Sequence, residues 1–310
     1  MGSDPFPPQG MGASELSRSG LVPRMGVMRR LCVGLLLLIP IQAGAGLLGL
    51  TALDWSRDGQ YVLYVDEGEV WVGLAPEGRN ARPLTEGAAT DWARFGPGDW
   101  FVYVAFSEQG YALWQATLAG ERTLLFSQDQ LRQSGALPGV ELIARPAVSP
   151  DGTNIAFIAY ADGQCDLYLF DLPSGTVRRL THTPGPVDTP DFSPDGRSLA
   201  FVGLWQVGAT LSWDLYVLDL VEGDRIEMLT EDPFFDWCPR FSPDGEWIAF
   251  ESSLRGPSDI HVIRRDGRER TAFTFDEWRD AFPCWSPEGD EIGYGSLRSY
   301  GWLILASKTS

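Results

Sequence analysis

Three aspartates occur at similar places in successive segments of this 310-residue chain, and they are its strongest candidates for chemistry. Asp188, Asp236 and Asp280 each lie a few residues ahead of a short apolar segment. Carboxylates gathered at one point bind a cation or a basic group, and a pair of them can act as general acid and base. The alternative is structural, because short aspartate side chains often bond to the backbone of turns and linkers.

Aromatic and arginine side chains surround these aspartates in the sequence. In the functional interpretation they form the walls of a binding surface for a peptide, and in the structural one they pack repeats together. Two of the arginines stand in matching Ser-Leu-Arg segments, where an ion pair with a carboxylate is favoured over contact with a ligand. Besides the three aspartates, the candidate binding residues are Trp205, Trp213, Phe234, Phe235, Trp237, Trp278, Arg279, Arg255 and Arg298.

The sequence lacks the motifs of common enzyme classes. It has two histidines, His182 and His261, and no Gly-x-Ser-x-Gly elbow, phosphate-binding Gly-Lys loop or His-Glu-x-x-His pair. A non-catalytic protein with a protein or peptide partner is therefore favoured. The alternative is an enzyme, a lyase or hydrolase that acts on a carbohydrate or small metabolite through these carboxylates. No cofactor is expected, because the one candidate set of Ca²⁺ ligands, Asp188, Asp191 and Asp195, includes a residue of a repeated turn that should face away.

One short motif occurs five times, and a degenerate sixth copy occupies Phe95-Gly96-Pro97-Gly98-Asp99. The copies recur at intervals of 40 to 53 residues, a period typical of stacked supersecondary units. Proline fixes φ, aspartate bonds to the backbone and glycine accepts a positive φ, so the motif predicts a tight turn. The complete copies are Trp55-Ser56-Arg57-Asp58-Gly59, Val148-Ser149-Pro150-Asp151-Gly152, Phe192-Ser193-Pro194-Asp195-Gly196, Phe241-Ser242-Pro243-Asp244-Gly245 and Trp285-Ser286-Pro287-Glu288-Gly289.

Each repeat reads as one small antiparallel sheet. In the clearest unit, residues 188–230, four short segments are separated by turn residues, and Phe192 is expected in the core. A single sheet of this size cannot bury both faces, whereas six sheets around a common axis can. The sequence therefore predicts an all-β fold, a six-bladed β-propeller of four-stranded antiparallel blades over residues 46–310. No helix is expected between residues 52 and 307.

The repeat resembles that of TolB-type propellers, also called WD-repeat-like propellers, of exported bacterial proteins. The resemblance rests on Ser193-Pro194-Asp195-Gly196, on Asp214–Leu220 and on Leu229-Thr230, and it extends over about residues 52–307. The Ser-Leu-Arg segments that end at Arg255 and Arg298 match a further element of that repeat. The resemblance implies a six-bladed propeller and export from the cytoplasm.

The loops of such a propeller fall on two rims. We call the turn rim the face with the Ser-Pro-Asp-Gly turns and the third-to-fourth-strand turns, which are short, repetitive and predicted to be structural. The linker rim has the second-to-third-strand loops and the blade-to-blade linkers, which vary in length, carry the candidate residues and are predicted to bind the partner. Two ways of closing the ring stay open: residues 46–51 supply a strand, or the sixth blade has three strands.

Residues 1–45 are not expected to belong to the propeller. Residues 1–24 are a leader or an expression-derived segment, since Leu21-Val22-Pro23-Arg24 resembles a protease-cleavable linker. Residues 25–45 combine Arg29 and Arg30, an apolar run and Ala43-Gly44-Ala45, which is typical of a secretory signal peptide. A periplasmic or extracellular location follows. The alternative is an uncleaved anchor, because the apolar run is long enough to cross a bilayer.

Charge and cysteine content limit the partners further. The net charge of −18 opposes binding to nucleic acid, whose backbone is also negative. A membrane partner is expected only if the N-terminal segment stays uncleaved. Three cysteines follow that segment, so at most one internal disulfide can form. Buried free thiols at Cys238 and Cys284 are favoured over a bridge between them.

Overall fold

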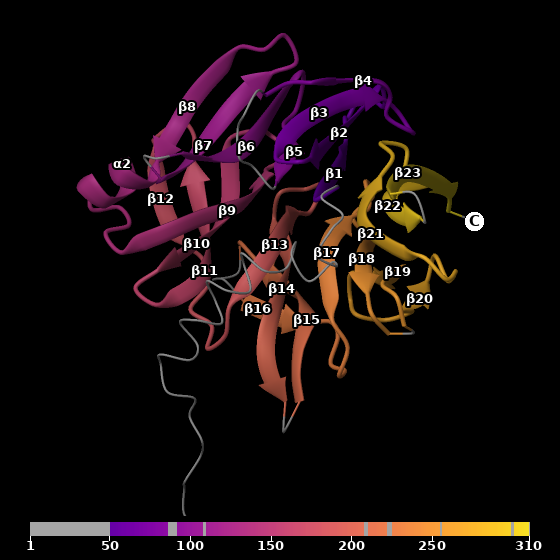
Figure 1. Ribbon diagram of the computed structural model, residues 1–310. Coiled ribbons are helices and arrows are strands. Elements are labelled where there is room, and N and C mark those ends of the chain that lie inside the picture. The colour runs from indigo at the N-terminus through magenta and orange to yellow at the C-terminus, as the bar shows by residue number, and fades with distance from the viewer. Residues whose placement is uncertain are drawn as a thin grey trace, which may run out of the picture.

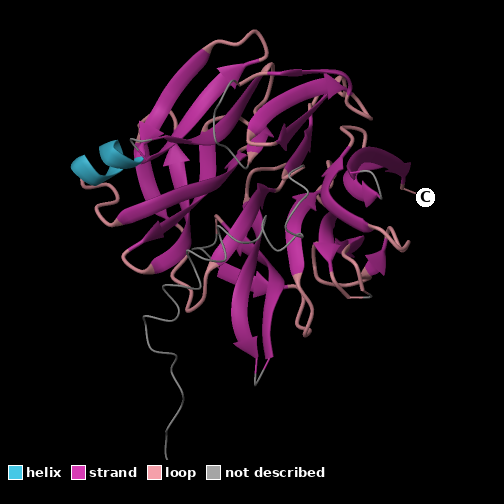
Figure 2. Ribbon diagram, viewed as in Figure 1, coloured by secondary structure: helices cyan, strands magenta, loops and turns pink. Residues whose placement is uncertain are grey.

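Six antiparallel sheets surround a common centre in the described part of the chain (Figures 1 and 2). The computed structural model describes residues 50–85, 92–107, 110–207, 210–221, 225–254, 256–298 and 301–309, except the side chains of 205–207, 210 and 301–303. The predicted leader and signal peptide, residues 1–45, lie outside the described residues. The all-β, six-bladed prediction is confirmed.

The first three blades run from the axis outward in chain order. Blade 1 contains β1 (Ala52–Trp55), β2 (Tyr61–Asp66), β3 (Glu69–Leu74) and β4 (Arg79–Pro83). Blade 2 contains β5 (Ala93–Phe95), β6 (Trp100–Ser107), β7 (Gly110–Thr117) and β8 (Arg122–Ser127). Blade 3 contains β9 (Val140–Val148), β10 (Asn154–Ala161), β11 (Gln164–Asp171) and β12 (Thr176–Arg179).

The last three blades repeat this order. Blade 4 contains β13 (Val187–Phe192), β14 (Ser198–Val207), β15 (Thr210–Asp219) and β16 (Arg225–Met228). Blade 5 contains β17 (Asp236–Phe241), β18 (Trp247–Ser252), β19 (Asp259–Arg264) and β20 (Thr271–Ala272). Blade 6 contains β21 (Arg279–Trp285), β22 (Glu291–Arg298) and β23 (Gly301–Lys308). Of the two predicted ways of closing the ring, the described residues thus show a three-stranded sixth blade.

The innermost strands form a closed ring. They contact one another in series, β1 with β5, β5 with β9, β9 with β13, β13 with β17, β17 with β21, and β21 with β1. The yellow last blade accordingly lies beside the indigo first blade (Figure 1). Every blade therefore has a neighbour on each of its two faces.

The core consists of separate apolar clusters between neighbouring blades. Blades 2 and 3, for example, meet where the rings of Phe126 and Phe157 lie 5.3 Å apart. The ring closes through a smaller cluster, in which Leu53 and Val62 of blade 1 pack with Cys284 of blade 6. Central strands such as β10 are buried on both faces, which explains their nearly continuous apolar sequence, whereas β4 at the outer edge is exposed throughout.

The repeated turn is held by its own side chains. In blade 4 the Ser193 hydroxyl donates to Asp195 Oδ1 at 2.6 Å and accepts from the Ser198 N–H at 3.0 Å. Gly196 adopts a φ of +70°, which glycine tolerates without steric cost. The same serine–aspartate bond recurs in blades 1, 3 and 5. This confirms the turn chemistry predicted from the motif.

The turns also fit against one another around the ring. The proline of one turn lies over the glycine of the next, so a Cβ added at Gly245 would stand 3.2 Å from Pro194 Cγ. The contact between Pro287 of blade 6 and Gly59 of blade 1 belongs to this series. The turn rim is therefore a packed ring of prolines and glycines.

The expectation that no helix occurs between residues 52 and 307 is wrong at one place. A six-residue helix, α2 (Gln128–Gln133), lies between blades 2 and 3 (Figure 2). The Ser127 hydroxyl accepts from the Gln130 N–H, and the Gln130 side chain accepts from the Ser127 N–H. This insertion falls within the longest interval between repeated turns. Six residues are too few to produce a helical periodicity in the sequence.

Replacement of Phe192 by alanine should destabilise the fold. This side chain is 8% exposed and packs between blades 3 and 4, so the truncation should lower the free energy of unfolding by about 3–5 kcal/mol. Urea denaturation followed by circular dichroism measures the effect. Phe275→Ala, at a side chain that is 77% exposed, is the control and should change stability little. Equal losses in both variants would contradict the core assignment.

Candidate functional site

The three predicted aspartates are buried, but the structure does not bring them to one point. Asp236 Oδ1 accepts from Arg270 of its own blade at 3.0 Å, and Asp280 accepts from the Ser296 hydroxyl of its own blade. Asp188 instead pairs across the interface with Arg145 of blade 3, at 3.4 Å. Each of the three carboxylates therefore has a different partner.

A difference of one residue in register explains this separation. Asp236 and Asp280 occupy the same position of their blades, opposite Ser252 and Ser296 in the second strand. Asp188 stands one position later, opposite Val202. Since successive side chains of a strand point to opposite faces, the Asp188 carboxylate is turned away from the direction of the other two.

Burial raises the pKa of Asp236 to about 6, and burial also raises the pKa of Asp280. A raised pKa is what a general acid requires, and the enzyme alternative predicts it. Both side chains, however, have 0% exposed surface and bond within their own blades. Their environment agrees with the structural interpretation of these two aspartates.

The aromatic candidates cluster where blade 4 meets the following linker. The rings of Trp213 and Trp237 lie 4.3 Å apart, with Trp213 buried. Phe234 is half-buried and Phe235 is 46% exposed. Trp205 lies in β14, but its side chain is outside the description. Part of the predicted aromatic surface is therefore packing, and Phe235 is its exposed portion.

The arginine candidates pair with carboxylates where the structure describes them. Arg298 lies over the ring of Trp278 at 5.3 Å and donates to Asp276 at 3.1 Å. Arg279 donates to the buried Glu251 of blade 5 at 3.0 Å. Arg255 lies outside the described residues. For Arg298 the predicted ion pair is confirmed.

A different group of charged residues faces the axis. The residue two positions before the turn serine occupies the same place in each inner strand. These six residues are Asp54, Arg94, Ala147, Asp191, Arg240 and Cys284. Four of them are charged, although the site is almost closed to solvent. Such a grouping requires compensation by ion pairs and hydrogen bonds.

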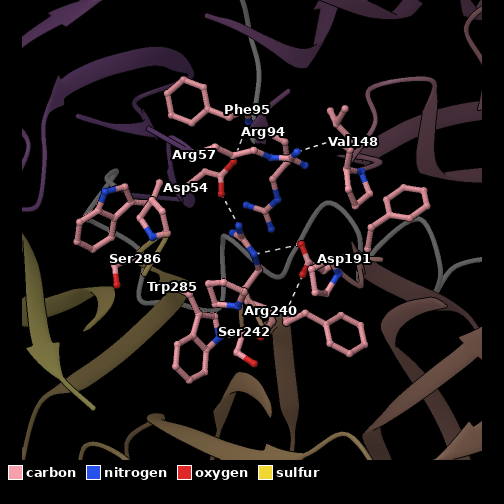
Figure 3. A pocket seen from close by; sticks show the side chains of 17 residues that line it. Asp54, Arg57, Arg94, Phe95, Val148, Asp191, Arg240, Ser242, Trp285 and Ser286 are labelled. Carbon is pink, nitrogen blue, oxygen red and sulfur yellow. Dashed lines mark hydrogen bonds and ion pairs between the residues drawn. The ribbon is translucent and has the colours of Figure 1, made fainter. Parts of the chain in front are cut away.

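Arg240 is the centre of this group. Its guanidinium pairs with Asp54 of blade 1 and, at 3.2 Å, with Asp191 of blade 4 (Figure 3). The second oxygens of the two carboxylates accept from backbone N–H groups, Asp54 from Phe95 at 2.7 Å and Asp191 from Phe241 at 2.9 Å. Burial opposes the charge of Arg240, but the two carboxylates raise its pKa above the ordinary value. Three blades are thereby joined by one side chain.

Arg94 is less well compensated. Its Nη1 donates to the Leu53 carbonyl at 3.2 Å, and its buried Nε has no hydrogen-bond partner among the described residues. Burial, together with the positive charge of Arg240, lowers the pKa of Arg94 to about 10. The guanidinium remains charged at neutral pH and has donors to spare.

Trp92 fills the axis beneath this group. Its side chain is 2% exposed and lies between two guanidinium groups, those of Arg94 at 4.7 Å and Arg145 at 4.5 Å. Its ring also meets Phe282 of blade 6 edge-on, with 6.3 Å between centroids. Residues from different sides of the ring therefore meet at one indole.

Four inner strands carry an irregularity that directs side chains towards this region. Arg145, Thr189, Cys238 and Phe282 have positive φ angles between 47° and 58°, and each precedes a proline. The pairing with the second strand shifts at these positions in blades 3 to 6. A bulge re-aims its side chain, and such backbone strain is often found at functional sites.

A pocket opens above Arg94 on the turn rim. Its volume is about 370 Å³, within the range of small-molecule sites. Arg57, Arg94 and Arg240 extend towards its middle, and Asp54 and Asp191 lie on either side of Arg240 (Figure 3). Aromatic side chains that end the inner strands and four turn prolines form the wall, namely Trp55, Phe95, Phe192, Phe241, Trp285, Pro150, Pro194, Pro243 and Pro287.

This pocket is not predicted from the sequence, because the repeated turns of the turn rim are expected to have a structural role only. The signal was present, since alignment of the repeats on the turn serine places the four charged residues in one column. Their ion pairs cross between blades, so no single repeat reveals them. The prediction that these turns are structural is correct but incomplete.

Metal and thiol chemistry receive no support from the described geometry. Cys165, Cys238 and Cys284 are buried free thiols, as predicted for Cys238 and Cys284, and burial raises the pKa of Cys284 to about 12. Asp191 pairs with Arg240, while Asp195 belongs to its turn. Among the residues that the structure describes, no three His, Cys, Asp or Glu side chains are placed to hold a metal ion.

Comparison with known proteins agrees with this architecture. The pattern of the TolB beta propeller domain matches residues 121–307, which is more than half of the chain. The chain belongs to the TolB β-propeller family. An uncharacterized protein of Agrobacterium fabrum is 30% identical over 261 residues, which cover 78% of this TolB-like chain and 83% of that protein.

Two solved structures of TolB proteins share the fold. The putative TolB of Agrobacterium tumefaciens has a TM-score of 0.64 at 22% identity, covering 84% of this chain and 90% of that one. TolB of Acinetobacter baumannii also has a TM-score of 0.64, at 20% identity, covering 87% and 64%. At these identities the likeness concerns the fold alone.

No helix within the described ranges is long and apolar enough to cross a membrane.

Removal of the central guanidinium should destabilise the propeller. Arg240→Met leaves Asp54 and Asp191 buried without their cation, so the free energy of unfolding should fall by about 3–5 kcal/mol. Urea denaturation at neutral pH measures this loss. Arg268→Met is the control, because Arg268 and its partner Asp266 are exposed, and little change is expected there. A similar small effect at Arg240 would show that the axial ion pairs do not hold the blades together.

Proposed function

We propose that this TolB-like propeller is an exported, non-catalytic protein that binds a segment of a partner protein on the linker rim of blades 4 to 6. The observation that carries the proposal is the exposure of large apolar side chains on this rim. Leu211, Phe235 and Phe275 are 48%, 46% and 77% exposed. Exposed aromatic side chains on a rigid scaffold are the usual anchors of protein interfaces.

The charge of the rim indicates the chemistry of the partner. Glu231, Asp276 and Glu277 are exposed on the same two linkers as Phe235 and Phe275. The chain as a whole carries a net charge of −18. An extended segment with basic and apolar side chains would complement both properties, because opposite charges speed association and apolar anchors supply affinity.

The scaffold supports this use of the rim. Phe235 stands beside the Trp213–Trp237 pair, since its backbone bridges to that of Trp213. Its N–H donates to the hydroxyl of Ser253 at 2.9 Å, and its carbonyl accepts from the Ser253 N–H at 3.0 Å, directly after β18. An anchor with a fixed backbone loses little conformational freedom when it binds.

The proposal of export rests on residues 25–45 of the sequence. Their charged start, apolar run and Ala43-Gly44-Ala45 are the features that signal peptidases recognise. Expression of the chain from Met25 in a Gram-negative host should yield a periplasmic protein that begins at Gly46. Mass spectrometry of the intact mature chain measures this. A chain that retains residues 25–45 in the membrane fraction would support the anchored alternative instead.

Binding is tested with a short fluorescent peptide composed of arginine, leucine and tryptophan. Fluorescence anisotropy should show saturable binding, and Phe235→Ser with Phe275→Ser should weaken it about tenfold or more, as loss of interface anchors does. Phe106→Ser is the matched control, because the exposed fraction of Phe106, 53%, lies between those of Phe235 and Phe275, but Phe106 belongs to blade 2. The proposal fails if the control weakens binding as much, or if a glutamate version of the peptide binds equally well.

A further inference from the structure

The turn-rim pocket carries more positive than negative charge, although the chain is acidic. Arg57, Arg94 and Arg240 line it against two carboxylates, Asp54 and Asp191, in a chain with a net charge of −18. A local excess of one positive charge in a concave site attracts an anion. This pocket is on the opposite rim from the proposed protein-binding surface.

The guanidinium groups differ in how many of their N–H donors have an acceptor. Arg240 is committed to Asp54 and Asp191, as described above. Within the described part of the chain, Arg94 donates to the Leu53 carbonyl, and its buried Nε makes no hydrogen bond. A guanidinium carries five N–H donors, and unpaired buried donors are costly. Arg94 is 4% exposed and forms part of the pocket lining, so its free donors can be satisfied there by an acceptor.

Arg57 is a departure from the repeat. It occupies the second position of its turn, where the other four complete copies have proline. Its side chain is exposed, extends over the pocket and donates to the Pro150 carbonyl of blade 3 at 2.5 Å (Figure 3). The turn does not require arginine, because Ser56 and Asp58 make the same hydrogen bond as in the proline-containing turns. The geometry of the turn therefore does not explain this residue.

We propose that the turn-rim pocket binds the carboxylate of a small organic acid with an apolar body. Arg94 supplies charged donors at the floor and Arg57 supplies them at the mouth, since arginine forks match a planar carboxylate. The apolar body packs against the wall of aromatic and proline side chains. A monoanion balances the excess charge, whereas a phosphate dianion would bring a second negative charge towards Asp54 and Asp191.

Two kinds of ligand have this chemistry, a free organic acid and the C-terminal residue of a peptide. Both present one carboxylate next to an apolar group. The volume of about 370 Å³ accommodates either a small acid or a terminal residue.

Isothermal titration calorimetry with N-acetylphenylalanine tests the proposal. The acid should bind saturably, and its uncharged amide should bind at least about tenfold more weakly, because charge-assisted hydrogen bonds to the arginines are lost. Equal binding of acid and amide, or no binding of the acid at millimolar concentration, would overturn the proposal.

Arg57→Pro is the decisive variant, because it restores the residue found in the other turns. It should weaken binding of the acid about tenfold, while Arg57→Lys should retain part of the affinity. Arg94→Met should abolish binding, and if that variant does not fold, Arg57→Pro alone decides. Arg268→Met, at an exposed arginine outside the pocket, is the control. Unchanged affinity in Arg57→Pro would contradict the assignment.

Two further comparisons identify the source and separate the two proposals. A short peptide that ends in phenylalanine, with a free or an amidated C-terminus, should show the same preference for the carboxylate if peptides are the source. Binding of the free acid without the peptide assigns the pocket to organic acids. The Phe235→Ser, Phe275→Ser variant should bind N-acetylphenylalanine normally, so failure at the linker rim leaves this inference standing.

Discussion

Burial of both faces of each small sheet is the constraint on which this structure depends. Central strands such as β10 and β14 are apolar on both sides, so a blade is stable only between two neighbours. Six apolar clusters, one at each interface, satisfy this requirement around the whole ring. The cluster between blades 6 and 1 is small, and there the Pro287–Gly59 contact and the Arg240–Asp54 pair add to it.

Side chains at the axis are accommodated differently from those between the blades. Inner strands converge there, and their equivalent side chains must either be small or compensate one another. Ala147 and Cys284 are small, and the charged residues of blades 1, 4 and 5 compensate one another, whereas Arg94 of blade 2 is compensated only in part. Buried ion pairs contribute little net stability compared with apolar packing of the same volume. The axial ion pairs nevertheless join blades 1, 4 and 5 across the centre of the ring.

Much of the fold can be predicted from the sequence because the same pattern of turns and strands recurs several times along the chain. Turn chemistry, strand alternation and period all point to blades, and the structure has them. Residue-level geometry is less accessible. Asp188 lies one residue nearer its turn serine than Asp236 does, but the opposite directions of the two side chains are visible only in the strand pairing. The axial pairs join residues far apart in the chain, such as Asp54 and Arg240, and α2 is too short to show a period. Ion pairs between residues far apart in the chain, and the directions of side chains near a register shift, thus cannot be predicted from the sequence alone.

Trp92 has a consequence for the propeller as a whole. Its indole is held between Arg94 and Arg145 and against Phe282, and it therefore closes the axis beneath the turn-rim pocket. A solute that enters this pocket stops at the indole. An effect of such a solute on the opposite side of the axis must pass through this stack of guanidinium and indole groups.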